Sequence, residues 1–468
     1  MPLTRREWLK AGAPALAAAQ AAEPPNVVLC MADDLGWGDT GYNGHPYLQT
    51  PNLDAMAAEG VRFDRFYAGA PVCSPTRGSV LTGRHPYRYG IYTANAGHMR
   101  PEEFTLAEIL RTRGYATGHF GKWHLGTLTN DVPDGRRGGR EKEHYAPPWE
   151  NGFDECFSTE VQMPTWNPME NQAFPARYWT GPARWATTNL EGDDSRVIMD
   201  RAVDFIGRAV GGKRRFFAVV WFHAPHLPVV AGPAYRARYA KFSDDEQHYY
   251  GAITALDEQM GRLRSELRRL RADANTMLWF CSDNGPEGPV AGVGVHRGSA
   301  GALRGRKRSL FEGGVRAPGL LEWPARLAKP RRVGAPCSTV DYLPTILAAA
   351  RAPLPAPRPL DGVDLTEAVG TSGWQRPRPI GFRTPRGNAA AEAARLGSPD
   401  HALIDNRYKL LSWLDEEKAD LLFDLAADPG ERFDLAAKLP GVVRPMKKTL
   451  REWAESCRRS DEGQDYSY

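Results

Sequence analysis

The segment PVCSPTRGSVLTGR, at residues 71–84, contains a single cysteine between two prolines, with an arginine four residues further on. A zinc site would need further thiolate or imidazole ligands at a regular spacing beside Cys73, and the segment offers none. A disulfide-stabilised fold would need many cysteines in a short chain, whereas this chain has six in 468 residues. Cys73 therefore requires another chemical explanation, which the rest of the chain must supply.

Side chains with oxygen ligands follow two strand-like runs closely. Asp33 and Asp34 follow NVVLCM, and Asp283 and Asn284 follow TMLWFCS. Taken singly, the paired aspartates could cap a helix and the DNG sequence could form a tight turn. Carboxylate and amide oxygens are hard ligands, so their shared position after strands favours a Ca²⁺ site, with Mg²⁺ as second choice, over a zinc site.

Basic and imidazole side chains recur in similar positions, at Arg77, Lys122, His124, His223 and Lys307. Arg77 lies in the first turn of a helix predicted to begin at Cys73, where a cation does not stabilise the helix dipole, so its position favours a bound anion. Lys122 and His124 are two residues apart in an extended or turn segment and are expected to point the same way. With a metal ion, these groups predict a site for a tetrahedral oxyanion, with two histidines for proton transfer. His226 is predicted instead to be a hydrogen-bonded core histidine.

Buried strands must position these residues. Apolar runs rich in β-branched and aromatic residues predict strands at residues 26–31, 115–120, 216–222 and 276–282. Amphipathic segments between them predict helices that begin near Thr50, Thr105, Ser195 and Ser243. This alternation predicts an α/β fold, with a large, mostly parallel sheet flanked by helices and a smaller C-terminal α+β subdomain. Because ligands bind at the carboxyl edge of such sheets, the turns after the strands are expected to converge on one rim.

The N-terminal sequence has the features of an export signal. Arg5 and Arg6 precede a weakly apolar, alanine-rich run that ends in small residues near Ala22. We predict a twin-arginine signal peptide at residues 1–22, a catalytic domain at 23–360 and a C-terminal subdomain at 361–468, with a proline-rich segment at the second boundary. The protein is then expected to be exported already folded and to be periplasmic or extracellular.

Composition excludes several other classes of protein. The net charge of +4 is small for this length and gives no case for nucleic-acid binding. No apolar run reaches the roughly 18 residues that a membrane span needs. If Cys73 is used for chemistry, five cysteines remain, and they cannot all pair within the chain. The thiols are therefore predicted to be mostly free and buried.

The cysteine segment resembles a known signature. CSPTRGSVLTGR is similar to the Cys-x-Pro-x-Arg signature of the type I sulfatases, in the alkaline-phosphatase-like superfamily. Further segments resemble that family's other blocks in the same order: ADDLGWGD, GKWHLG, HAPHLP, SDNG and LRGRKRSLFEGGVRAP. The resemblance covers roughly residues 26–344, and LLFDLAADPGERFDLA is a weaker match to the family's C-terminal subdomain. It implies an alkaline-phosphatase-like fold and the hydrolysis of sulfuric esters.

The resemblance also implies roles for the candidate residues. A formylglycine-generating enzyme would oxidise Cys73 to Cα-formylglycine, whose hydrate would attack sulfur with one oxygen and expel sulfate with the help of the other. A Ca²⁺ ion would be held by Asp33, Asp34, Asp283, Asn284 and the modified Cys73. Arg77 would stabilise the nucleophile and the sulfate, Lys122 would hold a sulfate oxygen, and His124 would take the proton in the elimination step. His223 and Lys307 would contact the sulfate and the leaving oxygen, although Arg306 and Arg308 replace the small residues common beside that lysine.

Two other functions fit part of the pattern. A formylglycine-dependent phosphonate monoester or phosphodiester hydrolase would use the same residue types, whereas a two-metal phosphatase would need Asp-His in place of Asp283-Asn284. A non-catalytic binder of sulfated glycans would be expected to have lost Cys73, Arg77 or a metal ligand, and the chain has all of them. The expected substrate is a sulfated polysaccharide or oligosaccharide, with leaving-sugar contacts from loops at His98, Arg100, residues 166–171, His296 and Arg297.

Overall fold

The computed structural model describes residues 23–132, 134, 142–170, 172, 175–288, 297–327, 329–355 and 357–466. The predicted signal peptide and His296, one of the candidate sugar contacts, lie outside these residues.

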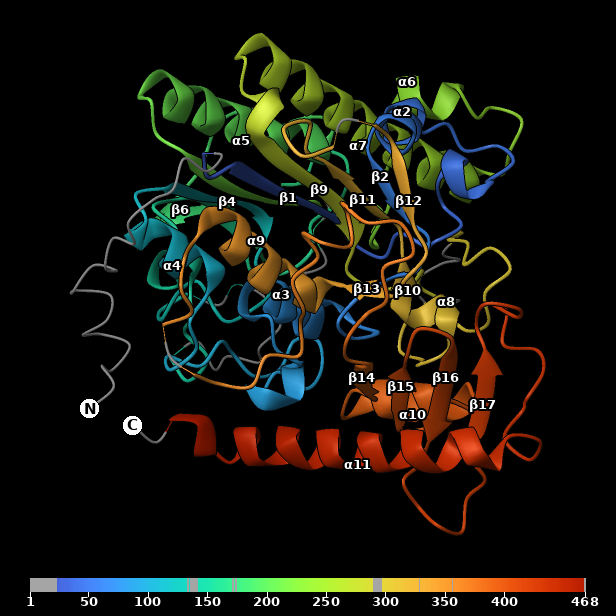
Figure 1. Cartoon of the computed structure of the whole chain (residues 1–468). Helices are drawn as coiled ribbons and strands as arrows, with labels where there is room; N and C mark the ends of the chain where they lie inside the picture. The colour runs from blue at the N-terminus through green and yellow to red at the C-terminus, as the bar shows by residue number, and fades with distance from the viewer. Residues whose placement is uncertain are drawn as a thin grey trace.

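A ten-stranded sheet forms the centre of the molecule, in the order β12-β2-β11-β9-β1-β8-β4-β5-β6-β7 (Figure 1). Its middle five strands are parallel: β9 (Thr276–Ser282), β1 (Asn26–Ala32), β8 (Phe216–Trp221), β4 (Ala116–Lys122) and β5 (Glu155–Thr159). The flanking strands are β12 (Arg331–Val333), β2 (Val61–Phe63), β11 (Gly319–Glu322), β6 (Trp179–Gly181) and β7 (Arg184–Trp185). Antiparallel pairing enters only toward the two edges of this described sheet.

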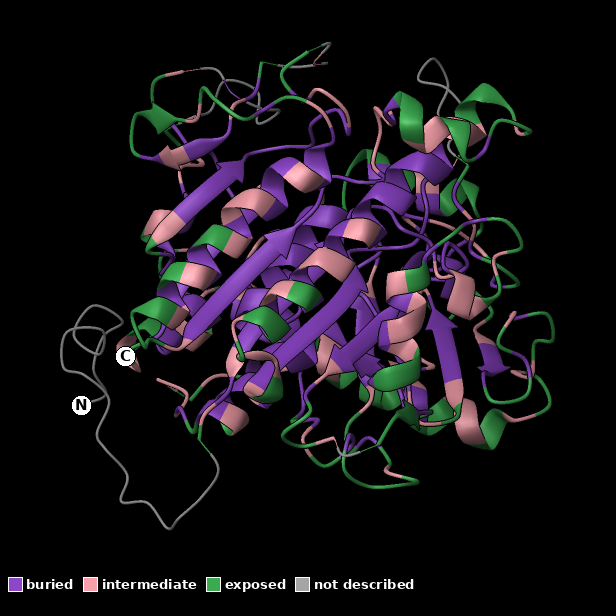
Figure 2. Cartoon of the chain, turned by 90° about the horizontal axis from the view of Figure 1, so that it is seen from above, coloured by how far each residue is buried: buried purple, intermediate pink, exposed green. Residues whose placement is uncertain are grey.

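Helices cover both faces of this sheet (Figure 1), and its middle strands are buried (Figure 2). On one face lie α2 (Pro51–Glu59), α5 (Asp194–Gly211) and α7 (Asp244–Arg269), and on the other lie α3 (Cys73–Thr82), α4 (Leu106–Thr112) and α9 (Tyr342–Ala350). Successive side chains of strand β1 alternate between the two faces of the sheet. Val28 and Cys30 pack on the side of α2, α5 and α7, whereas Val27 and Leu29 pack on the side of α3, α4 and α9.

The C-terminal part is an antiparallel four-stranded sheet, β14 (Ile380–Arg383), β15 (His401–Ile404), β16 (Tyr408–Ser412) and β17 (Leu421–Asp424). One face packs against the long helix α11 (Pro440–Asp461), through Leu403, Leu410 and Leu450. The other face packs against Leu310, Phe311 and α8 (Glu312–Val315), which belong to the catalytic part. In Figure 1 this subdomain lies below the central sheet, with α11 along its lower edge.

Smaller elements complete the described chain. A three-stranded sheet joins β3 (Phe66–Tyr67), β10 (Arg316–Ala317) and β13 (Cys337–Ser338). The short helices are α6 (Pro233–Ala237) and α10 (Asn388–Arg395), with 3₁₀ turns η1 (Gly41–Asn43), η2 (Pro86–Arg88), η3 (Pro148–Glu150), η4 (Asp273–Asn275), η5 (Thr339–Asp341) and η6 (Gln464–Tyr466).

The predicted fold class is confirmed: a large, mostly parallel sheet with helices on both faces and a smaller C-terminal subdomain. All six cysteines are free and buried, as expected. Among the described helices, none is both long and apolar enough to cross a membrane. The boundary at residue 360 stays a prediction, and Val363 and Leu365 pack in the same core cluster as α9.

Candidate active site

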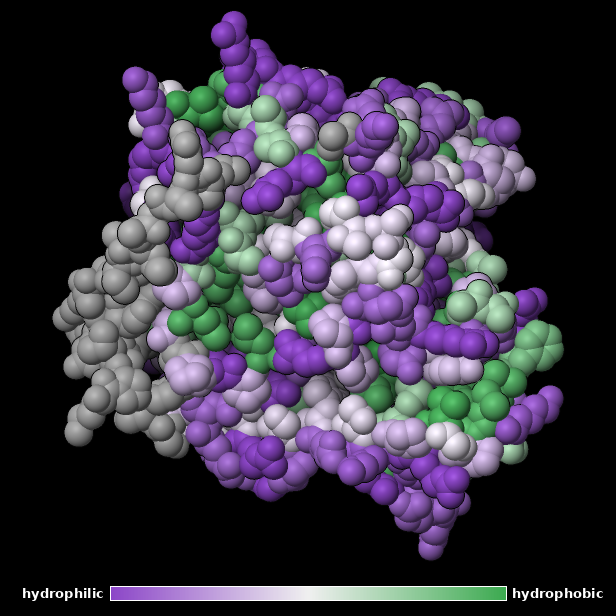
Figure 3. Space-filling model, in the orientation of Figure 1, coloured by the Kyte–Doolittle hydropathy of each residue, from purple (hydrophilic) through white to green (hydrophobic). Residues whose placement is uncertain are grey.

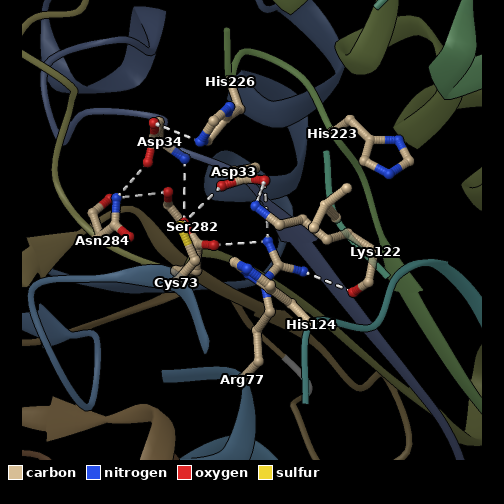
Figure 4. A network of polar contacts seen from close by, with 12 residues as sticks. Asp33, Asp34, Cys73, Arg77, Lys122, His124, His223, His226, Ser282 and Asn284 are labelled. Carbon is tan, nitrogen blue, oxygen red and sulfur yellow. Dashed lines mark hydrogen bonds and ion pairs between the residues drawn. The ribbon is translucent and has the colours of Figure 1, made fainter. Parts of the chain in front are cut away.

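Most of the candidate site residues lie together at the carboxyl edge of the parallel strands, around the first turn of one helix (Figure 4). Asp33 and Asp34 follow β1, Asp283 and Asn284 follow β9, and Lys122 is the last residue of β4. Cys73 is the first residue of α3, and every residue of that helix is buried. The strand order therefore brings side chains from four distant segments of the sequence into one cluster.

Cys73 is unsuited to act as an ordinary thiolate nucleophile. Its side chain is 2% exposed, and its Sγ lies 3.5 Å from Asp33 Oδ1. Burial raises the pKa of the Cys73 thiol to about 12, although the charges of Lys122 and Lys307 oppose the shift. An unmodified thiol at this position is protonated at neutral pH, and it is the thiolate that reacts.

Arg77 lies one turn along α3 and is fully buried. Its guanidinium donates to Asp283 Oδ2 at 2.6 Å and to the Lys122 carbonyl oxygen at 3.0 Å. The same group lies 5.2 Å from the centre of the Trp221 ring. These contacts fix a permanent positive charge at the base of the cluster.

Two lysines each pair with one of the neighbouring aspartates. Lys122 Nζ donates to Asp33 Oδ2 at 2.6 Å, and Lys307 Nζ lies 2.6 Å from Asp34 Oδ1. The side chain of Lys307 is 4% exposed, so this lysine is the one of its basic triplet that points inward. Arg306 instead donates to backbone carbonyls, and Arg308 pairs with Glu287.

The charges of these neighbours control the ionisation of the three buried carboxylates. Burial alone would raise the pKa of Asp33, but the surrounding cations, led by Lys122, hold it well below its usual value. The pKa of Asp34 is lowered in the same way, against burial, chiefly by Lys307. Burial, together with the nearby Asp33 carboxylate, raises the pKa of Asp283 to about 7, although the charge of Arg77 opposes the shift.

Three non-glycine residues of this rim have a left-handed backbone. Their φ angles are 65° at Asp34, 61° at His124 and 78° at Arg308. Such conformations cost on the order of 1–3 kcal/mol each and persist where the surrounding contacts maintain them. For His124, one such contact is a 2.6 Å hydrogen bond between its Nε2 and Asn95 Oδ1.

The two histidines of the HAPHLP segment lie in the reverse of the expected positions. His223 was expected at the active site and His226 in the core. His223 is fully buried, and its ring nitrogens lie 2.7 Å from Asp194 Oδ2 and 2.8 Å from Thr159 Oγ1. Figure 4 shows its ring apart from the cluster. The structure therefore does not bring His223 to the cluster around Cys73. Both of its ring nitrogens already contact other side chains, Asp194 and Thr159.

His226, expected to be a core residue, lies at the cluster instead. Its Nε2 is 3.6 Å from Asp34 Oδ2, and its side chain is 14% exposed. Ligand atoms of His226, Asp33, Asp34 and Cys73 lie within 4.8 Å of one another. The sequence did contain a signal for this residue, because His226 lies in the same strand-end turn as His223.

The donor set fits a hard divalent cation. Asn284 donates from Nδ2 to Asp34 Oδ1 at 2.7 Å, while its buried Oδ1 has no hydrogen-bond partner among the described residues. An unused buried carbonyl oxygen beside three carboxylates is an environment that a cation would complete. Oxygen donors of this kind suit Ca²⁺ better than zinc.

The large, mostly parallel sheet, with carboxylates and cations clustered at its carboxyl edge, agrees with the alkaline-phosphatase-like fold that the sequence resembles. The chain matches the sulfatase family over residues 25–352 and the C-terminal region of N-sulphoglucosamine sulphohydrolase over residues 305–456. It therefore belongs to the sulfatase family, among the type I sulfatases, and is a sulfuric ester hydrolase.

Individual relatives extend over nearly the whole chain. N-acetylgalactosamine-6-sulfatase of Canis lupus familiaris is 33% identical, over 95% of this chain and 90% of its own. Arylsulfatase A of Homo sapiens is 34% identical, over 94% and 89%. Among solved structures, Ps i-CgsB in complex with k-i-k-neocarrahexaose superposes with a TM-score of 0.77, at 25% identity and over 95% of this chain and 97% of that one.

The exchange of the two histidines leads to a first prediction. His226→Gln should lower kcat/KM for sulfate esters by about 10²–10⁴-fold, the range for loss of a general acid or base, with little change in thermal stability. His223→Gln is the matched variant, and it should lower the melting temperature because it disturbs a buried pair with Asp194. Equal losses of activity per folded molecule in both variants would contradict this assignment.

Proposed function

We propose that the protein hydrolyses sulfate esters of carbohydrates, through a formylglycine made from Cys73 and with a bound Ca²⁺ ion. The observation that carries the proposal is the position of Cys73, buried at the first turn of α3 among aspartates and three buried cations. A thiol with a pKa near 12 explains why this cysteine would need chemical conversion. The hydrated aldehyde would supply a nucleophilic oxygen and a second hydroxyl to release sulfate.

Asp33, Asp34, Asp283 and Asn284 would hold the cation, together with the converted Cys73. When bound, calcium would supply two positive charges close to the reacting groups. The unused Oδ1 of Asn284, buried beside three carboxylates, supports this choice of residues.

The cations of the chain would bind the sulfate group. Arg77 of α3, Lys122 of β4 and Lys307 of the segment before α8 come from separate parts of the chain, so they can contact different oxygens of one tetrahedral group. Their pairing with aspartates fixes their positions before the substrate arrives. This preorganisation stabilises negative charge without a reorganisation cost in the reaction.

Two histidines would move protons. His124, held by Asn95, would accept the proton released in the elimination step. His226 is the more exposed of the two, so it would face the departing alcohol and protonate its oxygen. We assign to His226 the leaving-group role expected for His223.

The substrate class is inferred from the relatives. One relative is named for a sulfated amino sugar, and the superposed Ps i-CgsB was solved with a neocarrahexaose. Of the candidate sugar contacts, Arg100 pairs with Asp461 of α11 at 2.9 Å, so we do not assign it to the substrate.

Export by the twin-arginine route and maturation by a formylglycine-generating enzyme remain part of the proposal. The Arg5-Arg6 pair and the alanine-rich run after it support the first. The CSPTR segment supports the second.

The test is a substrate panel. The chain without residues 1–22 is co-produced with a formylglycine-generating enzyme and assayed on sulfated galactans, chondroitin 6-sulfate oligosaccharides, an aryl sulfate, an aryl phosphodiester and a phenylphosphonate. We expect turnover of the aryl sulfate and of at least one sulfated sugar. Faster cleavage of the phosphodiester or phosphonate than of every sulfate ester would favour the alternative hydrolase instead.

Calcium removal gives a second prediction. Dialysis against a chelator should reduce sulfate-ester hydrolysis by at least about 100-fold and lower the melting temperature, because three buried carboxylates then repel one another. Adding Ca²⁺ should restore both quantities, and Asp283→Asn should weaken the restoration. Full activity in metal-free protein, checked by elemental analysis, would exclude the ion from the proposal.

A further inference from the structure

A cavity of about 510 Å³ lies between the start of the C-terminal sheet and α11, outside the cluster around Cys73. Four arginines and one histidine line it, drawn from distant segments of the chain: Arg383, Arg386, His401, Arg451 and Arg458. Tyr87 of η2 also contributes to the wall, and η2 packs against α11. On the face shown in Figure 3, hydrophilic residues gather along the lower edge, over α11.

Two of these arginines are held by aromatic rings. The Arg383 guanidinium carbon lies 4.4 Å from the centre of the Tyr87 ring, and that of Arg386 lies 3.7 Å from the Tyr92 ring. The two rings are themselves 5.0 Å apart. Stacking uses the faces of a guanidinium and leaves its N–H edge for an oxyanion.

The carboxylates nearby are already engaged. Asp461 accepts hydrogen bonds from Tyr92 and Arg100, and Glu455 pairs with Arg458. In contrast, neither Arg383 nor Arg386 forms an ion pair within the described part of the chain. The cavity therefore has an excess of positive charge at two immobilised guanidinium groups.

His401 adds an unsatisfied polar atom to the same wall. It is 8% exposed, lies opposite Arg383 in the pairing of β14 with β15, and its buried Nδ1 has no hydrogen-bond partner among the described residues. Burial and the charge of Arg383 lower the pKa of His401 to about 4. The ring is thus neutral at pH 7, and it can hydrogen-bond a hydroxyl or anionic group that enters the cavity.

One short segment touches both this cavity and the active site. The Arg386 N–H donates to the Tyr92 carbonyl oxygen at 3.3 Å, and three residues later Asn95 is bonded to His124. Three residues span at most about 11 Å when fully extended. The segment from Tyr92 to Asn95 therefore links the backbone beside Arg386 to a residue that contacts His124.

We propose that this cavity is a second oxyanion site, which binds a sulfate group of the carbohydrate chain at a distance from the ester being cleaved. Arg383 and Arg386 bind the sulfate oxygens, and the ring of His401 contacts the sugar or its sulfate. The inference rests on the proposed carbohydrate substrate. It predicts that chains with several sulfates bind more tightly than single sulfated sugars.

The test compares two double variants with the same change in charge. Arg383→Gln/Arg386→Gln removes the proposed contacts. Arg268→Gln/Arg269→Gln is the control, on exposed positions of α7 at the opposite end of the molecule in Figure 1. The single variant Arg386→Gln, at an exposed position, serves if the first double variant is unstable. Each is assayed on an aryl sulfate and on size-defined carrageenan and chondroitin 6-sulfate hexasaccharides, and binding of the labelled hexasaccharides is measured in a Cys73→Ala background.

The Arg383/Arg386 variant should bind a hexasaccharide about tenfold more weakly, or about 1.4 kcal/mol, and its KM should rise accordingly. Its kcat/KM for the aryl sulfate and all values of the control should match the parent protein. The second site would be overturned if the Arg383/Arg386 variant binds the hexasaccharide as tightly as the parent protein, or if the control variant is weakened equally. It would also be overturned if the parent protein binds no hexasaccharide, or binds inorganic sulfate more tightly than the hexasaccharide. A hexasaccharide that is bound through these arginines but never cleaved would keep the second site and overturn the proposed substrate class.

Discussion

Cys73→Ala is expected to lower kcat/KM for sulfate esters by at least about 10⁴-fold, the scale of effect seen when a nucleophile is removed. The variant should fold normally, because the side chain it loses is small and the helix α3 is held by the packing of all its residues. The measurement is turnover of an aryl sulfate, with the melting temperature and circular dichroism as checks on the fold.

The control for this variant is another buried cysteine. Cys337 lies in β13, and its Sγ contacts the Ala335 carbonyl oxygen rather than any group of the active site. Cys337→Ala should keep the activity of the parent protein. Sulfate-ester hydrolysis that survives in a folded Cys73→Ala protein would remove this residue from the mechanism.

Lys409→Met is expected to destabilise the protein by about 3–5 kcal/mol, the typical cost of breaking a buried ion pair. The lysine on β16 is fully buried, and its Nζ lies 3.0 Å from Glu312 and 2.9 Å from Glu431. Its removal would take from Glu431 the cation beside it and leave Glu312 with Arg316, whose Nη1 lies 3.4 Å away. Because Glu312 belongs to α8, directly after the Lys307 segment, the loss should also loosen the contact between the C-terminal sheet and the active site.

Urea unfolding gives the free energy of unfolding for this comparison. Lys448→Met is the matched control, because Lys448 lies on α11 with its side chain 79% exposed. It should change stability by less than about 0.5 kcal/mol. A Lys409→Met protein as stable as the control would show that the buried charges relax without cost.

The strands and most site residues could be predicted because their signals are local. The apolar run at residues 276–282 predicts a buried strand, and β9 has the same bounds. Once the strands are parallel, their carboxyl ends share one edge, so Asp33 and Asp283 must approach each other whatever the loops do. The helix predicted to begin at Cys73 is also present, as α3.

The two histidines of the HAPHLP turn could not be distinguished in this way. His226 rather than His223 lies beside Asp34, because Asp194 and Thr159, from other segments of the chain, hold the His223 ring. The second oxyanion site had no sequence signal for a similar reason. Arg383, His401 and Arg451 belong to three separate elements, β14, β15 and α11, and the packing of α11 on the C-terminal sheet brings them to one cavity.

The central claim is that Cys73 acts in hydrolysis only after its conversion to an aldehyde. Trypsin should release residues 66–77 as one peptide, and conversion should lower its mass by about 18 Da, the difference between a CH₂SH and a CHO side chain. Across preparations made with increasing amounts of formylglycine-generating enzyme, kcat for a sulfate ester should rise in proportion to the converted fraction of this peptide. Full sulfate-ester turnover by protein whose peptide carries only cysteine would contradict the account.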